Sequence, residues 1–160
     1  MSKPTAAADG DILQLVTFHV GDEEFGVDIL AVREINRMMA ITRVPHAPEF
    51  VEGVVNLRGQ VIPVVDLRTR FQLDVVAHDK STRIVVVELS EKVVGFLVDS
   101  VSEVLRIPRD LIEPPPPIVG SVDSEYIQAV VKLDDRLLIL LNLQKLLSGG
   151  EARELEGFDA

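Results

Sequence analysis

The stretch VTFHVGDEEFGVDILAV, residues 16–32, decides the fold of this chain, because a second version of it follows as VVVELSEKVVGFLVDSV, residues 85–101. The two stretches match at their ends and at Gly26 and Gly95, which lie 69 residues apart. Chance alignment of two Val-rich hairpins is the alternative explanation. One copy of a true repeat of this size seldom buries its own apolar face, so the two copies would fold as a pair.

The match continues beyond these two stretches. At the same offset, Glu34 meets Glu103. At a second offset of 76 residues, Asp66-Leu67 meets Asn142-Leu143, and extra residues around Pro114–Pro117 account for the longer spacing. Two matching blocks in the same order, separated by one insertion, argue against chance. The sequence therefore predicts a duplicated domain.

The domain is expected to span residues 12–148, with pseudo-repeats at about 12–71 and 82–147. Residues 1–11 are rich in Ala, Asp and Gly and predict a disordered N-terminal tail, and residues 149–160 predict a solvated acidic tail. The sequence leaves open whether strands cross between the two lobes.

Composition excludes several classes of protein. Of the 160 residues, 47% are hydrophobic, with no Trp and one Tyr, which favours β-structure and argues against a base-stacking platform. A net charge of −10 would repel a phosphate backbone, so nucleic acid is excluded as a partner. The absence of Cys rules out disulfides and thiolate metal sites. The sequence offers no signal peptide and no apolar run near the roughly 20 residues of a spanning helix, which predicts a cytoplasmic protein.

Short apolar runs separated by turn residues predict strands throughout the chain. We expect them at residues 13–20, 24–27, 51–57, 61–65, 83–89, 93–98, 101–107, 127–133 and 136–141. Many short strands at regular spacing are typical of small barrels rather than of a parallel sheet. Pro63 lacks the N–H that a ladder needs, so it is expected at an edge or a bulge.

Short helices are expected between these strands. Ile29, Val32 and Ile35 recur every three residues after Asp28, which predicts a short helix with an Asp N-cap. Two more helices are expected after equivalent caps: residues 67–71 after Asp66, and 143–147 after Asn142.

No constellation of catalytic or metal-binding residues emerges from the sequence. His19, His46 and His78 fall in a strand, a Pro-flanked loop and a polar linker, and none has a second histidine at metal-ligand spacing. Phosphate-binding glycine loops and a nucleophile elbow are missing as well. We therefore predict no enzyme activity, no cofactor and no metal site. A small-molecule enzyme or binder, using His46 with Glu34 in a groove between the lobes, is the alternative.

Glu34 and Arg58 are polar residues embedded in apolar repeats. A solvated Glu and a turn Arg are the simplest interpretation. Each repeat must meet its twin, however, and the seam between two lobes is a natural groove for a partner helix. The copies also differ, because Arg58 tips one hairpin and its counterpart Asp134 tips the other with the opposite charge. We expect the functional residues at positions where the two copies differ.

Seven runs of the sequence closely resemble bacterial chemotaxis coupling proteins of the CheW type. They are GDEEFGVDIL (21–30), VREI (32–35), PEFVEG (48–53), NLRG (56–59), PVVDLR (63–68), VDSVSEVL (98–105) and LILLNL (138–143). The resemblance covers about residues 12–148 in order, and the joint pattern is highly specific.

The resemblance implies a mostly β fold, with two SH3-like five-stranded β-barrel lobes packed on a shared core and short helices between strands. It implies a non-catalytic adaptor that couples the cytoplasmic tip of methyl-accepting chemotaxis receptors to the regulatory domain of a CheA-type histidine kinase. Such an adaptor is cytoplasmic and is recruited to receptor arrays at the inner membrane without inserting into it. A scaffold of a non-motility chemosensory pathway is the alternative within the same family.

The resemblance also implies where partners bind. In the family, the Glu of the Val-x-Glu-Ile run and the Arg of the Asn-Leu-Arg-Gly run lie near the receptor and kinase contacts, and they correspond here to Glu34 and Arg58. The expected receptor- or kinase-binding residues are Val32, Glu34, Ile35, Asn56, Arg58 and Gly59.

Overall fold

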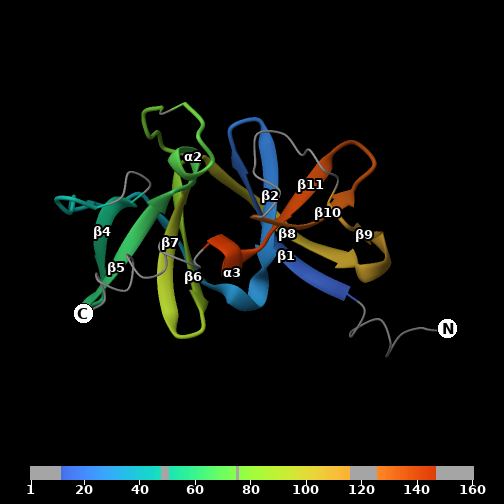
Figure 1. Cartoon of the computed structure of the whole chain (residues 1–160), viewed down its shortest axis with the longest axis horizontal. Coiled ribbons are helices and arrows are strands. Elements are labelled where there is room, and N and C mark those ends of the chain that lie inside the picture. Colours follow the sequence, from blue (N-terminus) through green and yellow to red (C-terminus); the bar gives the residue numbers. More distant parts are fainter. Residues whose placement is uncertain (1–11, 48–50, 75, 116–125, 147–160) are drawn as a thin grey trace.

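Two β lobes lie side by side along the long axis of the molecule (Figure 1). The computed structural model describes residues 12–47, 51–74, 76–115 and 126–146. The two predicted tails, Pro116-Pro117 and the expected end of the last helix lie outside the described residues.

The described elements confirm all the expected strands, with ends that agree within one residue, and add two more strands, β3 and β9. In chain order the elements are β1 (Ile12–Val20), β2 (Glu23–Asp28), η1 (Ile29–Ala31), β3 (Val32–Arg37), β4 (Val51–Leu57), β5 (Gln60–Asp66), α2 (Leu67–Arg70), β6 (Arg83–Leu89), β7 (Lys92–Val98), β8 (Ser100–Pro108), η2 (Arg109–Leu111), β9 (Ile112–Glu113), β10 (Ile127–Lys132), β11 (Leu137–Leu141) and α3 (Leu143–Leu146).

Each lobe is built on one sheet, and each sheet takes strands from both halves of the chain. The first sheet has the order β8-β1-β2-β11-β10-β9, and the second has the order β3-β6-β7-β5-β4. The chain passes from the first lobe to the second between β2 and β3, and returns between β7 and β8 (Figure 1). The predicted mostly β, two-lobed fold is confirmed, with the two-residue β9 as a sixth strand in the first sheet.

The sequence repeat is also a repeat of strand register. In the first sheet, β2 and β11 run parallel and Gly26 pairs with Leu140. In the second sheet, β7 and β5 run parallel and Gly95 pairs with Val64, which are the equivalents of those two residues at offsets of 69 and 76. The two lobes therefore share one strand pattern, and a residue in one lobe has a definable counterpart in the other.

The largest apolar cluster joins the two lobes. It takes Val16 and Phe25 from the first sheet and Val85 and Phe96 from the second, all buried. Two smaller clusters lie within one sheet each. Because the shared cluster needs side chains from both sheets, neither lobe can complete its core alone.

The sequence expectation of a helix over Val32 and Ile35 is wrong. Asp28 does cap a helical turn, since its Oδ1 accepts a hydrogen bond from the Leu30 N–H at 2.9 Å, but η1 ends at Ala31. Val32 and Ile35 then lie on strand β3, which pairs with β6. A bulge shifts the register of this pairing next to Val32, but the side chains of β3 still alternate between half-buried and exposed positions, so Val32 and Ile35 lie on opposite faces. Spacing by three over so short a run therefore did not distinguish a helix from a bulged strand.

The other two caps are confirmed. Asp66 Oδ1 accepts from the Arg68 N–H at 3.0 Å at the start of α2, and Asn142 Oδ1 accepts from the Lys145 N–H at 3.1 Å at the start of α3. Within the described residues, no helix is long and apolar enough to span a membrane.

Pro63 was expected at an edge or a bulge, and this expectation is wrong, because β5 lies between β7 and β4 in the sheet. The bulge in this hairpin is on β4, between Val51 and Gly53. Parallel pairing of β5 with β7 begins at Val64, so the proline comes just before the part of the strand that pairs on that side.

Candidate partner-binding surfaces

The tip of the β4–β5 hairpin is shaped by three of the expected binding residues. Arg58 and Gly59 have φ angles of 52° and 88°, and positive φ at both central residues is the pattern of a type I′ turn. Asn56 stabilises the turn, because its Oδ1 accepts a hydrogen bond from the Gly59 N–H at 2.8 Å. Asn56 and Gly59 therefore present Arg58, whose own conformation is unusual for a side chain of its type.

The structure brings Glu34 and Arg58 together in an ion pair between Arg58 Nη2 and Glu34 Oε2. The pair joins the tip of the β4–β5 hairpin to β3, although the two residues are 24 positions apart. The Arg58 side chain is 74% exposed and that of Glu34 is 20% exposed. The guanidinium therefore stays open to a partner while Glu34 fixes its position.

The two apolar residues of the expected set behave differently from each other. Val32 is half-buried and packs against the shared core, whereas Ile35 is 40% exposed on β3. Ile35 is thus the one that offers apolar area to a partner.

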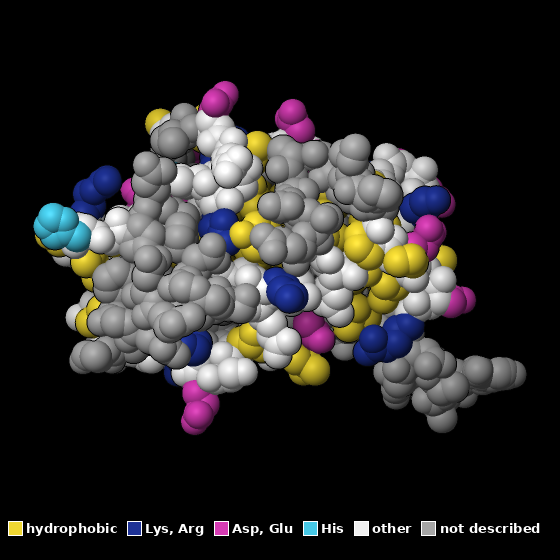
Figure 2. Space-filling view, in the orientation of Figure 1, with side chains coloured by type: hydrophobic (Ala, Val, Ile, Leu, Met, Phe, Trp, Pro, Cys, Tyr) yellow, Lys and Arg dark blue, Asp and Glu magenta, His cyan; other side chains and the backbone are white. Residues whose placement is uncertain are grey.

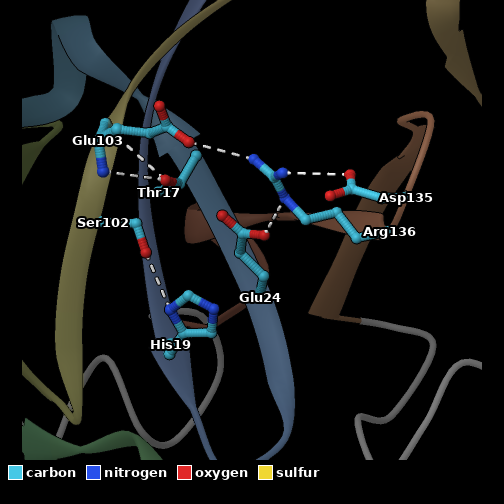
Figure 3. Close-up of polar contacts among 7 residues, drawn as sticks. All are labelled: Thr17, His19, Glu24, Ser102, Glu103, Asp135 and Arg136. Atoms are coloured by element: carbon cyan, nitrogen blue, oxygen red, sulfur yellow. Dashed lines mark hydrogen bonds and ion pairs between the residues drawn. The ribbon is translucent and has the colours of Figure 1, made fainter.

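The other lobe carries a related network around Arg136 (Figure 3). Glu103 is the counterpart of Glu34, and it pairs with Arg136 at 3.1 Å. The same guanidinium contacts the buried Glu24 at 2.6 Å and Asp135 at 3.3 Å. The Glu24 charge leads the causes that raise the pKa of Arg136. Both lobes therefore tie a strand glutamate to an arginine of a hairpin, but with three carboxylates around the arginine in this lobe.

The histidines do not assemble a site within the described residues. His19 Nδ1 lies 2.9 Å from Ser102 Oγ (Figure 3), and His78 Nε2 lies 4.0 Å from Glu52 Oε2. His46 lines a cavity of about 360 Å³ whose lining does not include Glu34. No group of three or more His, Asp or Glu side chains in the described ranges is placed to hold a metal ion.

A groove of about 460 Å³ opens at the seam between the lobes, and sequence reasoning placed none of its residues there. Its apolar lining is Leu30, Ala31, Leu89, Leu141 and Leu143, and Leu30 is 90% exposed. Its charged lining residues are Asp28 and Glu88, and its amides are Gln128, Asn142 and Gln144. The one sequence signal is Leu30 itself, an apolar residue two positions after the capping Asp28, whose counterpart in the other copy is Asp99.

A second set of polar contacts ties the seam together away from this groove. Arg68 of α2 donates from Nε and Nη2 to the two oxygens of Asp99, at 2.9 and 2.7 Å. Asp99 is the residue between β7 and β8, and it also accepts from the Gly21 N–H at 2.9 Å. Burial alone would raise the pKa of Asp99, but the hydrogen bonds from Arg68 and Gly21 outweigh it and hold that pKa below its ordinary value.

A duplicated β fold with an apolar groove at the seam and an exposed arginine at a hairpin tip has the architecture of a protein-binding module. A family model described as the CheW-like domain matches residues 14–151. The chain belongs to the CheW-like family.

Similar proteins agree with this assignment. A chemotaxis protein CheW of Klebsiella aerogenes is 39% identical over 86% of this chain and 83% of its own length. A chemotaxis protein CheW of Helicobacter pylori is 36% identical over 86% of this chain and 82% of its own. The crystal structure of the scaffolding protein TtCheW from Thermoanaerobacter tengcongensis superposes with a TM-score of 0.80, at 37% identity, covering 87% of this chain and 90% of that one.

Proposed function

We propose that this protein is a non-catalytic adaptor of chemotaxis signal transduction that couples methyl-accepting receptors to a CheA-type histidine kinase. The observation that carries the proposal is the Glu34–Arg58 pair, because it places an exposed guanidinium on the tip of a hairpin in a fold of the CheW-like family. Catalysis needs reactive side chains that converge on one point, whereas the features described above are surfaces open to another protein.

Two surfaces are available for two partners. The seam groove has an apolar lining that suits the helices of a receptor tip, since a helix docks by laying apolar side chains into such a groove. Ile35 and Arg58 lie on the second lobe and give a surface for the kinase regulatory domain or for the receptor. An exposed Arg beside an apolar residue is a common hot-spot combination.

Coupling requires that the partners bind with different affinity in two receptor states, because only differential affinity shifts a population. Single contacts of this size are weak, and an array of many copies would add their strength through avidity. The adaptor would thus work from the cytoplasm at receptor arrays, through its partners rather than by inserting into the membrane.

A pull-down tests the proposal directly. The immobilised chain is offered the cytoplasmic tip of a methyl-accepting receptor and, separately, a CheA-type regulatory domain. We expect both to be retained by the wild type, and Arg58→Ala to weaken at least one of them while Asp134→Asn, a change at the counterpart tip, serves as the control. Retention of neither partner by the wild-type chain would overturn the proposal.

The output of the pathway is a separate question. A deletion strain tested for swimming and for surface motility distinguishes a chemotaxis adaptor from the scaffold of a non-motility chemosensory pathway. For the small-molecule alternative, the seam groove has no histidine among its described lining residues, and its two carboxylates lack a catalytic partner there.

A further inference from the structure

The β4–β5 hairpin and its counterpart in the other lobe, the β10–β11 hairpin, contain the same bulge. The register of the first hairpin shifts around Glu52, and that of the second shifts around Gln128. The repeat offset of 76 residues makes these two positions equivalent. A β-bulge redirects the side chain of its extra residue. Both lobes therefore use a bulge to aim one polar side chain at the open end of a hairpin.

A second pair of equivalent residues follows at the other strand of each hairpin. β5 ends at Asp66, which caps α2, and β11 is followed by Asn142, which caps α3. Gln128 and Asn142 line one groove, so the two positions share one environment in the first lobe. That lobe thus has two neutral amides at the base of its hairpin, whereas the second lobe has the two carboxylates of Glu52 and Asp66.

The base of the β4–β5 hairpin is an unfavourable place for two negative charges. Asp66 is 7% exposed, and the Glu52 side chain is 30% exposed. Burial raises the pKa of Asp66, and the nearby charge of Glu52 acts in the same direction, although the hydrogen bond from the Arg68 N–H opposes both. The amides of the other copy would avoid this cost, so the two carboxylates indicate a role other than stability.

One histidine faces the two carboxylates from the segment that follows α2. His78 Nε2 lies 4.0 Å from Glu52 Oε2, and a protonated His78 also acts on the charge of Asp66. The His78 side chain is 34% exposed, so it can exchange a proton with water. Histidine is the side chain that ordinarily gains or loses its charge between pH 5 and 8. One proton on His78 therefore balances two carboxylates.

The other charged groups around Asp66 do not supply this balance. Arg68 lines the same cavity of about 120 Å³ as Asp66 and His78, but both its Nε and its Nη2 donate to Asp99. Asp79 also lines this cavity and adds a negative charge. Within the described lining of the cavity, His78 is thus the cation that a change of pH can switch on or off.

Glu52 also borders a second cavity, which Arg43 and His46 line with it. Both of these side chains are exposed, so water and salt screen their charges from Glu52. Figure 2 shows histidine and basic side chains at the outer end of the second lobe, on the face that it presents. A histidine of this lobe outside the cluster, His46, is therefore needed as a control.

We propose that Glu52, Asp66 and His78 form a proton-dependent clip at the base of the β4–β5 hairpin, closed when His78 carries a proton and loosened when it does not. A carboxyl group with a raised pKa loses stability as pH rises through the raised value, so Asp66 acts in the same direction as His78. Arg58 lies at the tip of this hairpin, so its presentation to a partner would depend on pH. That consequence rests on the proposed function, whereas the clip itself does not.

Hydrogen exchange of the full chain at pH 6 and pH 8, corrected for intrinsic rates, tests the clip. The amides of residues 51–55 and 64–66 report on it, and the equivalent residues 127–131 and 140–142 are the internal control. We expect protection at the base of the β4–β5 hairpin to fall by about three- to fivefold relative to the control between the two pH values, the size expected of a partly exposed ion pair.

The variants separate the clip from general effects of pH. Glu52→Gln with Asp66→Asn copies the other lobe and keeps a helix cap, so it should abolish the difference between the two pH values. His78→Gln should leave the hairpin base loosened at both, whereas His46→Gln should behave like the wild type. Circular dichroism at each pH checks that every variant is folded, and the single changes Glu52→Gln and Asp66→Asn replace the double variant if it is not.

Three results would overturn the clip. They are an equal response of both hairpins to pH in the wild type, a wild-type response in the folded amide variants, and a wild-type response in His78→Gln. All three are measured on the isolated chain. Failure of the clip is therefore distinguishable from failure of the adaptor function, which depends on retention of receptor tip and kinase domain in the pull-down.

Discussion

Replacing Arg58 by Asn separates a binding role from a structural one. The residue has a φ of 52°, and a left-handed conformation costs a residue with an ordinary side chain about 1–2 kcal/mol. Asn adopts this conformation more easily, so the change to Asn relieves part of that cost. The retention of Arg at a strained position is itself a reason to suspect a function.

The ion pair with Glu34 works in the opposite direction. An exposed pair contributes about 0–1 kcal/mol, and here the guanidinium is 74% exposed. Arg58→Asn therefore relieves backbone strain and loses the ion pair, two contributions of similar size and opposite sign. We expect the free energy of unfolding to change by less than about 1 kcal/mol. Arg58→Ala keeps the strain and loses the pair, so it should lower the melting temperature by no more than about 4 °C.

Partner affinity should respond quite differently. Loss of an exposed arginine at the centre of an interface weakens binding by roughly tenfold or more. Titration calorimetry should therefore give both variants a correspondingly higher dissociation constant for the kinase regulatory domain or the receptor tip. Glu34→Gln and the double variant complete a cycle for both stability and affinity. We expect weak coupling in stability and strong coupling in affinity.

Ser90→Asn is the matched control for the backbone term. Ser90 has a φ of 53° in the β6–β7 turn, and its side chain is uncharged, so replacing it changes the backbone strain without breaking an ion pair. The change should stabilise the chain by up to about 1 kcal/mol. If Arg58→Asn instead lost more than about 2 kcal/mol of stability and bound its partners normally, Arg58 would be a structural residue and the reasoning would be wrong.

Three further predictions concern the scaffold. Gly53→Ala should destabilise the chain severely, because the new Cβ would lie 2.3 Å from a backbone oxygen, whereas Gly59→Ala, with open space around its Cα, should lose only about 1–2 kcal/mol in denaturant unfolding. The pKa of Asp99 is depressed, so its stabilisation is present above the ordinary carboxyl pKa and is lost as pH falls through the depressed value; Asp99→Asn should flatten the stability profile in this acidic range. Arg136→Met should lower the melting temperature because it leaves the buried Glu24 carboxylate without the arginine that pairs with it, and adding Glu24→Gln should recover part of the loss.

Most of the fold was accessible from the sequence because the repeat and the strand pattern are local and redundant. The match of Gly26 with Gly95 predicts that these two glycines occupy equivalent positions in two sheets, even when the strand pairing is unknown. The exchange of strands between the lobes was not accessible, because either partner strand would satisfy the same apolar pattern. Strand β3 was missed for a different reason, since its exposure alternates but its half-buried positions hold Val32, Glu34 and Asn36, so no apolar period of two appears in the sequence.

The hairpin residues could be identified as candidates from the sequence, but the ion pair could not. Glu34 and Arg58 stand out as polar residues in apolar runs, and only the three-dimensional arrangement brings β3 to the tip of the β4–β5 hairpin. The seam groove is harder still. Its walls come from the ends of β2, β6 and β11, from η1, β10 and α3, and no single segment carries a recognisable pattern.

A duplicated fold makes the differences between its copies informative, because both copies satisfy the same backbone. Arg68 and Asp99 pair at one end of the seam, whereas their counterparts at the two repeat offsets, Gln144 and Leu30, cannot form such a pair at the other end. The chain instead keeps Leu30 exposed there, which leaves apolar area in water at about 25 cal/mol for each Å². A partner that covers Leu30 would recover that free energy, which supports the proposal that this end of the seam is a binding surface.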